Sequence, residues 1–530
     1  MIKYENFFLY LISTILILFF LINLYQISTQ HWSALIDMDI IVIYNSLLIS
    51  SGYEQEYRDH PAFTTFLIIG GIFKLLSFFQ DSYSANIDVI LSSQNIDKTF
   101  QYYFIVARII NYFINILLIY FFYKFLNLLK IEKTLNYSIC LILIFSQWYS
   151  MSFFALRSEI LSIVFFTIAM VFILSKKRDI VLNYFIAGIF LALAMLTKIQ
   201  ILFFIAFPIF LIPIFYLDKG KQEATLIKSK ILSNYLILSL ILGIIFYVVL
   251  QIFIQDHPRF ERNKYLDLFF FLLSFSIISF YYLFYNKYNL ALFKKNILLL
   301  SSILNGFIFL IFVFIFLDQV NFLEINNFIF LRRTNPIHYL TEFTNTFAEG
   351  TVSTNFLIKS AYEILSNYSF SLLELFSLLF IVFLNIKKNY NIDNQHVIFV
   401  IILLLIFLMN STINSFSRGY IYYHSYYTFC YLVVLSVCVN NFKNKYSNYF
   451  IYFIFIIFTY NSFNFDTFPD SRRFFYKEVF NRKIELTEIC KDLKLQKNLR
   501  KPPLKIHFFQ YYQEKFNDRA LNNLCGELKS

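Results

Sequence analysis

The chain has 530 residues, of which 58% are hydrophobic and only 15% are charged, and its formal net charge is +12. A mean hydropathy of +0.61 excludes a string of ordinary soluble domains and predicts a polytopic membrane protein. The lysines and arginines stand in short groups between apolar runs, which is typical of cytoplasmic loops of membrane proteins. We therefore expect membrane lipid, and not nucleic acid, to be the partner of this basic chain.

Thirteen apolar runs in the chain are candidates for membrane-spanning helices. The bilayer core offers no water to unpaired backbone groups, so each span must be a helix of about 20 apolar residues. We predict an all-α polytopic membrane protein with these thirteen spans, the first of which is an uncleaved anchor because no small-residue cleavage site follows it. The predicted spans are 7–25, 102–123, 135–153, 159–175, 183–197, 200–217, 231–254, 268–285, 297–317, 369–386, 396–412, 420–440 and 448–463.

The segment 61–79 is apolar enough to span, but two glycines and Lys74 interrupt it. If it is left out of the count, every short basic cluster falls on the side of Lys3, as the positive-inside rule requires of the cytoplasmic face. If it crossed, all of these clusters would move outside. We therefore predict that 61–79 is a helix lying along the outer membrane surface. The basic loops include Lys124, Lys130 and Lys133; Lys176, Lys177 and Arg178; Lys219, Lys221, Lys228 and Lys230; Lys287, Lys294 and Lys295; Lys387 and Lys388; and Lys443 and Lys445.

This topology divides the chain into a transmembrane domain, 1–463, and a small polar C-terminal region, 464–530, which we expect to be extracytoplasmic. Whether Cys490 and Cys525 in that region pair depends on the side of the membrane that it occupies. No spacing of Cys and His predicts a zinc site. The predicted outer loops are 26–101, 255–267 and 318–368.

The first outer loop, 26–101, holds the densest set of charges outside the spans. Asp37 and Asp39 form Asp-Met-Asp shortly after the first span. Side chains at i and i+2 point to different faces of a helix, but from a loop or a first turn both can approach one site. Such a pair could bind Mg²⁺ or Mn²⁺ through oxygen ligands, or supply a general base and its orienting partner, and we commit to no metal or other cofactor. The same loop contains Glu56, Arg58, Asp59 and His60.

The order of these residues resembles a known family. The acidic pair after the first span, Gly-Tyr at 52–53, and Asp-His-Pro at 59–61 opening a juxtamembrane helix resemble the first periplasmic loop of the GT-C glycosyltransferases. The resemblance is strongest to the dolichyl-phosphate-mannose-protein mannosyltransferase-like branch, which includes the bacterial lipid A aminoarabinose and galacturonic acid transferases. Ala-Arg at 107–108, Arg-Ser-Glu at 157–159 and a stretch at 187–198 that ends in Thr-Lys also match in order.

The resemblance covers roughly residues 30–215 and implies a GT-C-like fold. It implies an inverting transfer of a sugar from a polyprenyl-phosphate donor to a glycan, lipid or protein acceptor, on the extracytoplasmic side of a bacterial inner membrane. Asp-Met-Asp stands where the family commonly has Asp-Glu, and His-Pro-Ala where it has His-Pro-Pro, so either Asp37 or Asp39 could be the catalytic base.

The transfer also needs cations for the leaving lipid phosphate, because fixed positive groups in a partly desolvated site stabilise it strongly. Five cations map to the outer ends of predicted spans and are the predicted phosphate ligands. They are Arg58, Arg108, Arg157, Lys198 and Arg418. The further residues expected to contact substrate are Glu56, Asp59, His60, Glu159 and His424.

Structural alternatives remain open for several of these residues. Lys198 could instead snorkel to the outer interface, and Arg157 and Glu159 could form a mutual salt bridge that fixes helix ends. Arg418 could anchor an interfacial aromatic belt. At the level of function, a polysaccharide-lipid transporter or flippase and an O-antigen polymerase or ligase are the alternatives to a glycosyltransferase. Transporters usually carry their charges near the membrane midplane, whereas these charges lie at span ends.

Overall fold

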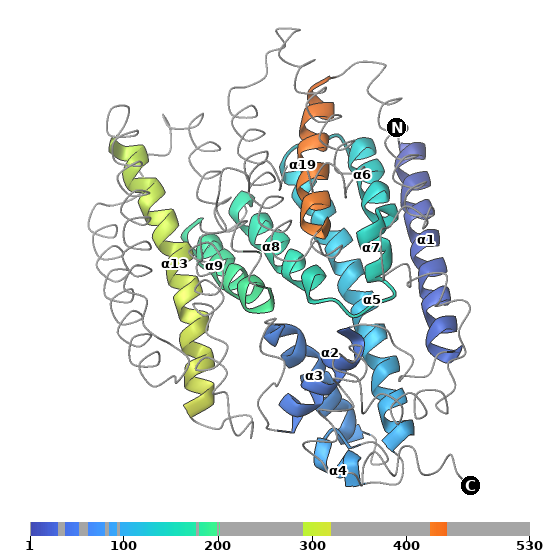
Figure 1. Cartoon of the computed structure of the whole chain (residues 1–530). Coiled ribbons are helices and arrows are strands. Elements are labelled where there is room, and N and C mark those ends of the chain that lie inside the picture. The colour runs from blue at the N-terminus through green and yellow to red at the C-terminus, as the bar shows by residue number, and fades with distance from the viewer. Residues whose placement is uncertain are drawn as a thin grey trace, which may run out of the picture.

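The computed structural model describes residues 2–29, 38–51, 62–79, 84–92, 96–175, 180–198, 201, 290–319 and 424–442. Within these ranges the regular structure is entirely helical, which confirms the predicted all-α class for this part of the chain (Figure 1). The helices are α1 (Ile2–Thr29), α2 (Met38–Ser50), α3 (Phe63–Phe79), α4 (Ile87–Ser92), α5 (Ile96–Leu128), α6 (Lys133–Phe145), α7 (Gln147–Ser152), α8 (Ser158–Leu174), α9 (Ile180–Thr197), α13 (Leu290–Gln319) and α19 (His424–Phe442).

Three helices in the described part of the chain are long and apolar enough to cross a membrane: Asn6–Tyr25, Lys98–Leu128 and Ile180–Thr197. They coincide with three predicted spans and confirm the membrane character of the chain. Four further predicted spans, 135–153, 159–175, 297–317 and 420–440, contain shorter apolar helices. The other six lie outside the described residues apart from Ile201, as does the polar region 464–530.

One predicted span is interrupted. The run 135–153 forms two helices, α6 and α7, because the chain adopts an extended conformation at Ser146. The hydroxyl and the N–H of Ser146 both donate to the carbonyl of Leu143, at 2.7 and 3.1 Å. A serine side chain that bonds to nearby backbone in this way competes with the helical ladder, and hydropathy alone does not reveal that competition.

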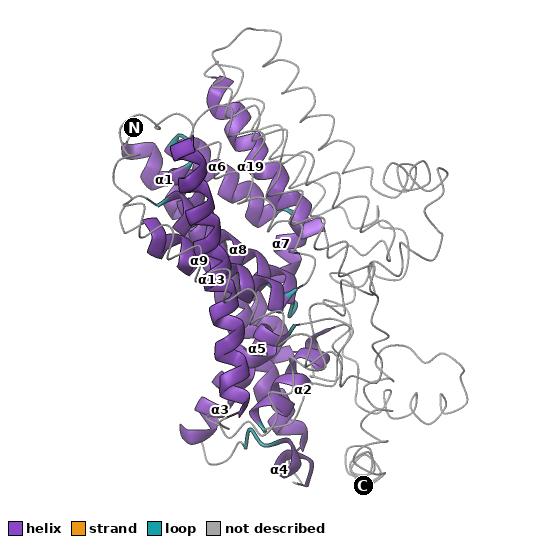
Figure 2. Ribbon diagram, turned by 90° about the vertical axis from the view of Figure 1, so that its left-hand side faces the viewer, coloured by secondary structure: helices purple, strands orange, loops and turns teal. Residues whose placement is uncertain are grey.

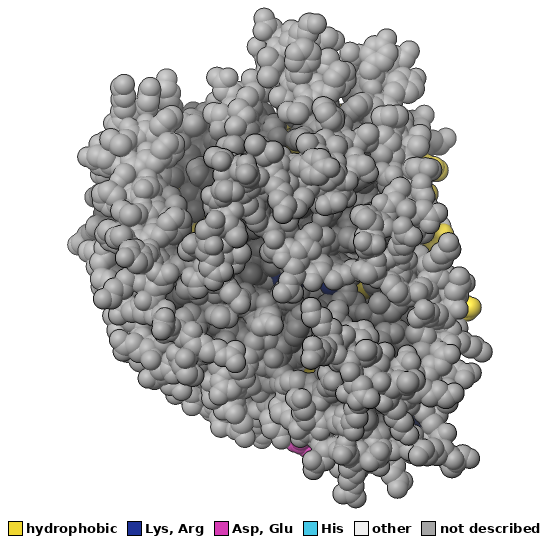
Figure 3. Space-filling view, viewed as in Figure 1, with side chains coloured by type: hydrophobic (Ala, Val, Ile, Leu, Met, Phe, Trp, Pro, Cys, Tyr) yellow, Lys and Arg dark blue, Asp and Glu magenta, His cyan; other side chains and the backbone are white. Residues whose placement is uncertain are grey.

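Helix α1 lies at the edge of the bundle and turns an apolar face outward. Phe7, Tyr10, Ile17 and Leu21 are exposed on it, and Figure 3 shows hydrophobic side chains along this edge of the molecule. The opposite face of α1 packs on the bundle, where the Tyr112 hydroxyl donates to the carbonyl of Leu16 at 2.7 Å. A face that is apolar and unpacked suits contact with lipid chains.

Helix α5 has 33 residues and is therefore about 50 Å long, whereas a hydrocarbon core is about 30 Å thick. It begins six residues before the predicted span 102–123 and ends five residues after it. The first part of α5 packs against α2, α3 and α4, and the rest packs against α6 and α8. Helix α5 thus joins two parts of the molecule, which we call the α2–α4 layer and the bundle.

The α2–α4 layer lies at the end of the bundle where α1 ends and α5 begins (Figures 1 and 2). The predicted helix at 61–79 is present as α3, whereas α2 falls in a region that the sequence suggested was loop. At 13 residues, α2 is too short to be recognised as a span. The two helices approach closely because Gly70 contacts the carbonyl of Ser46, leaving no room for a Cβ. Their apolar core includes Val42, Leu47, Phe66, Ile69 and Phe73.

In the bundle, α8 packs between α5 and α9, and α9 packs along α13. The α9–α13 crossing depends on two glycines: a Cβ at Gly188 would overlap the carbonyl of Ile303, and one at Gly306 would overlap the carbonyl of Phe185. Small residues that bring helix backbones together are the usual means of packing membrane helices.

Replacing Gly188 with alanine should therefore destabilise the protein, by about 1–3 kcal/mol, since the new methyl group meets backbone that cannot move aside. Gly71→Ala is the matched control, because it is also a helix glycine and a Cβ there meets nothing within 4 Å. Thermal unfolding in detergent, followed by near-UV circular dichroism, should show a lower midpoint for Gly188→Ala only. Equal midpoints for the two variants would contradict the close crossing of α9 and α13.

Candidate functional site

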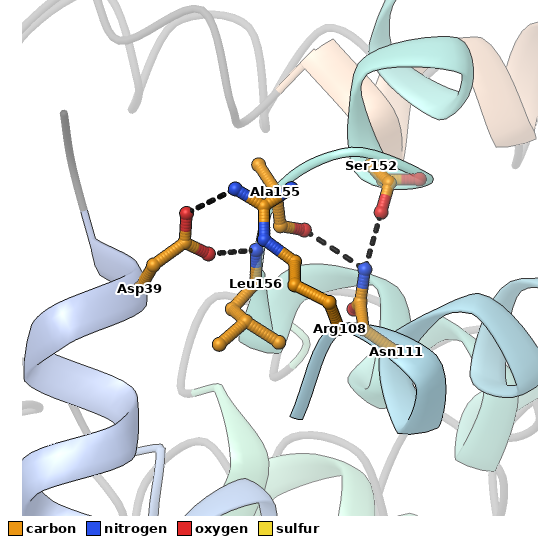
Figure 4. Close-up of polar contacts among 6 residues, drawn as sticks. All are labelled: Asp39, Arg108, Asn111, Ser152, Ala155 and Leu156. Carbon is orange, nitrogen blue, oxygen red and sulfur yellow. Dashed lines mark hydrogen bonds and ion pairs between the residues drawn. The ribbon is translucent and has the colours of Figure 1, made fainter. Parts of the chain in front are cut away.

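Two of the predicted site residues form an ion pair between the α2–α4 layer and the bundle. The guanidinium of Arg108, on α5, lies 2.6 Å from Oδ2 of Asp39, in the first turn of α2. The side chains are 5% and 3% exposed. The other carboxylate oxygen of Asp39 accepts a hydrogen bond from the N–H of Leu156 (Figure 4). Both oxygens of Asp39 are therefore engaged.

Local features favour these charges at these positions. An aspartate in the first turn of a helix interacts favourably with the positive end of the helix dipole, as Asp39 does on α2. The guanidinium of Arg108 lies over the ring of Phe104, one turn earlier on α5, at 5.3 Å from the ring centre. Nε of Arg108 is buried and makes no hydrogen bond within the described residues, so the guanidinium keeps a donor that Asp39 does not use.

A second buried ion pair joins α8 to the end of α9. Nζ of Lys198 lies 3.0 Å from Oε1 of Glu159, and the two side chains are 3% and 6% exposed. Glu159 is in the first turn of α8, and Lys198 directly follows the last residue of α9. Each charge therefore has the sign that its helix end favours. The Lys198 side chain is buried in this pair, and Arg157 also interacts electrostatically with Glu159.

Arg157 lies between the two pairs. It occupies the N-cap position of α8 in an extended conformation and is buried. It is close enough to interact electrostatically with both Arg108 and Glu159. Three cations and two carboxylates thus gather where α2 meets the bundle, near the start of α8 and the end of α9.

The chain between α7 and α8, residues 153–157, forms a turn and not a helix, and the side chain of Asn111 on α5 holds it in place (Figure 4). Nδ2 of Asn111 donates to the carbonyls of Ser152 and Ala155, at 2.6 and 2.9 Å. Sequence reasoning missed this contribution. The available signal was a pair of asparagines, Asn111 and Asn115, one turn apart in an apolar span, since polar side chains are costly there.

The structure thus brings together five of the predicted site residues: Asp39, Arg108, Arg157, Glu159 and Lys198. His424 is the first residue of α19, and the structure does not describe its side chain. The predicted site residues that lie outside the described ranges are Asp37, Glu56, Arg58, Asp59, His60 and Arg418.

A metal site was one interpretation of the Asp-Met-Asp sequence. Among the described residues, no group of three or more His, Cys, Asp or Glu side chains is placed to hold a metal ion. Asp39 directs its two oxygens at Arg108 and at the Leu156 N–H. The observed role of this carboxylate is to join α2, α5 and the start of α8.

Comparison of the chain with protein-family models, with curated proteins and with solved structures gives no match. The interpretation of the site therefore rests on its own residues and geometry.

The buried pair of Asp39 and Arg108 has a measurable energetic signature. Arg108→Met leaves a buried carboxylate without its partner and should cost about 3–5 kcal/mol of stability. Adding Asp39→Asn removes that charge and retains an oxygen for the Leu156 N–H, so the double variant should recover part of the loss. Chemical unfolding of the four proteins in detergent gives the coupling between the two sites. Additive effects of the two substitutions would contradict the pair.

Proposed function

We propose that this chain is a membrane glycosyltransferase that moves a sugar, with inversion, from a polyprenyl-phosphate donor to a lipid-linked or cell-surface glycan. The observation that carries the proposal is the buried convergence of Arg108, Arg157 and Lys198, with their two carboxylates, at one end of the membrane helices. This location suits a polyprenyl-phosphate sugar, because the lipid chain of such a substrate lies in the membrane and its charged phosphate lies at the membrane edge.

The cation cluster suits a phosphate in particular. Arg108 and Arg157 carry like charges and repel each other, and a bound anion would offset that repulsion. Lysine has three donors, so Lys198 can keep its contact with Glu159 and still donate to a second anion. In a site that excludes water, such fixed donors stabilise a leaving phosphate much more than they would in solution.

In the proposed reaction the hydroxyl oxygen of the acceptor bonds to the anomeric carbon of the sugar. The bond from that carbon to the phosphate oxygen breaks, and its electron pair stays on the polyprenyl phosphate. Attack on the face opposite the phosphate inverts the anomeric centre, and a carboxylate takes the proton of the hydroxyl.

Of the two candidate bases, we assign this proton transfer to Asp37. Both oxygens of Asp39 are already engaged, one with Arg108 and one with the Leu156 N–H, and an ion pair with arginine makes a carboxylate a weaker base. Asp37 directly precedes the first residue of α2 in the sequence. In this proposal Asp39 is a positioning residue, and the remaining cations, Arg58 and Arg418, are further candidates for the donor site.

The proposed side of action is extracytoplasmic. Along α5, Arg108 lies 16 residues before Lys124, which is about 24 Å of helix. Lys124 and the nearby Lys130 and Lys133 belong to a basic cluster of the kind that faces the cytoplasm. Arg108 is nearer the start of α5, whereas Lys124 is near its end and Lys130 and Lys133 lie beyond it, which supports an outer location for the site.

Three single substitutions test this assignment: Asp37→Asn, Asp39→Asn and Asp88→Asn. Transfer is followed in membranes supplied with a labelled polyprenyl-phosphate sugar. Asp37→Asn should lower the rate about 10²- to 10⁴-fold, the usual contribution of a general base. Asp39→Asn should have a smaller effect, because asparagine can still accept the Leu156 N–H. Asp88, an exposed acid on α4, serves as control and should leave transfer unchanged. Full transfer by the Asp37→Asn variant would show that Asp37 is not the base.

A further inference from the structure

A short non-helical segment lies buried at the centre of the candidate site. Residues 153–157 connect α7 to α8, and all five side chains are buried. Irregular backbone is tolerated at such a place in a membrane protein only where protein groups satisfy its N–H and C=O groups. The partners of this segment therefore decide its position.

Side chains on one face of α5 hold this segment and Ser152, the α7 residue that precedes it. Asn111 donates to the carbonyls at both ends of the turn, Ser152 and Ala155. Asn115 donates to the same Ser152 carbonyl at 3.1 Å, and the Ser152 hydroxyl donates back to Oδ1 of Asn115. The N–H of Leu156 is taken by Asp39. The backbone is thus fixed on both sides of Ala155.

The same face of α5 carries Arg108. Positions 108, 111 and 115 follow one another at i, i+3 and i+7, the spacing of a single stripe on a helix. One stripe therefore supplies a cation of the site and the two amides that hold the neighbouring backbone. The held segment ends in Arg157, and Glu159 follows in the first turn of α8.

We propose that Asn111 and Asn115 are positioning residues of the transferase, which hold residues 153–157 so that Arg157 and Glu159 stand beside Arg108 and Lys198. This inference rests on the function proposed above. A buried asparagine in an apolar span costs stability unless it is hydrogen-bonded. The Asn111 amide donates to the carbonyls of Ser152 and Ala155, and the Asn115 amide donates to the carbonyls of Ser152 and Asn111. The two asparagines act on the reaction indirectly, by positioning Arg157, and Arg157 is proposed to contact the donor phosphate.

The chain offers a closely matched control at the other end of α8. Asn183, on α9, is equally buried, and its Nδ2 donates to the carbonyl of Ser175 at 3.0 Å, just after α8 ends. Asn111 and Asn183 therefore make the same kind of hydrogen bond, from a buried side-chain amide to a backbone carbonyl, near the two ends of α8. Only Asn111 lies beside the charged residues of the site.

The first measurement is structural and needs no transfer activity. Ala155→Cys is placed in a variant whose five native cysteines are replaced by serine, and labelling of the introduced thiol by a membrane-impermeant maleimide is followed. The buried position should be protected in this background. Adding Asn111→Leu should expose it, as should Asn111→Asp, because a carboxylate cannot donate to the Ser152 and Ala155 carbonyls. Asn183→Leu should leave the introduced thiol protected.

The second measurement is kinetic, in the chain with its native cysteines. Asn111→Leu should lower kcat/KM for the donor by about tenfold to a hundredfold, since small misplacements of positioning groups have effects of this size. KM for the acceptor should not change. Asn115→Leu should act in the same direction, and Asn111→Gln, which keeps the amide, should restore part of the loss. Asn183→Leu should leave donor kcat/KM as it is.

Unchanged labelling of the introduced thiol in both Asn111 variants would overturn the positioning role while leaving the proposed function intact. An equal loss of donor kcat/KM in Asn183→Leu would overturn it as well, because a general loss of packing would then explain the result. Absence of transfer by the unsubstituted chain would overturn the proposed function and the positioning role together, whatever the labelling shows.

Discussion

The contact on which this arrangement depends is the buried ion pair of Arg108 and Asp39. Neither charge is exposed, so each depends on the other for its stabilisation, and removing one would leave an uncompensated charge in apolar surroundings. The pair joins α2 to α5, and the Leu156 N–H on Asp39 adds the chain that leads into α8. Through one carboxylate, the α2–α4 layer is fixed to the bundle beside the other site residues.

Favourable electrostatic interactions also explain how five charged groups can be buried together among apolar helices. Acids stand in the first turns of α2 and α8, and Lys198 follows the end of α9, so each of these three interacts favourably with a helix dipole. Two of the three cations have a carboxylate partner within 3.0 Å. For the proposed transfer, the pairs have a second consequence: they fix the cations before a substrate binds, which is what electrostatic stabilisation of a leaving group requires.

Hydropathy predicted the membrane character and the helices now seen as α1, α3, α5 and α9, because apolar length is the signal for a helix in a bilayer. It missed α2, which is too short, and the break at Ser146, where the chain is extended. Charge position in the sequence selected Asp39, Arg108, Arg157, Glu159 and Lys198 as candidates, but it did not show which of them pair. Glu159 pairs with Lys198, 39 residues away, and the packing of α8 against α9 brings these two residues together.

The central claim is that the buried cations at the start of α8 receive a lipid phosphate. The most direct test is a cryo-EM structure with a non-transferable polyprenyl phosphonate sugar bound in nanodiscs. We predict phosphonate oxygens about 2.7–2.9 Å from nitrogens of Arg157 and Lys198, the usual length of a charge-assisted hydrogen bond. A phosphonate bound beside Lys124 and Lys130, at the other end of α5, or bound without contact to either Arg157 or Lys198, would contradict the account.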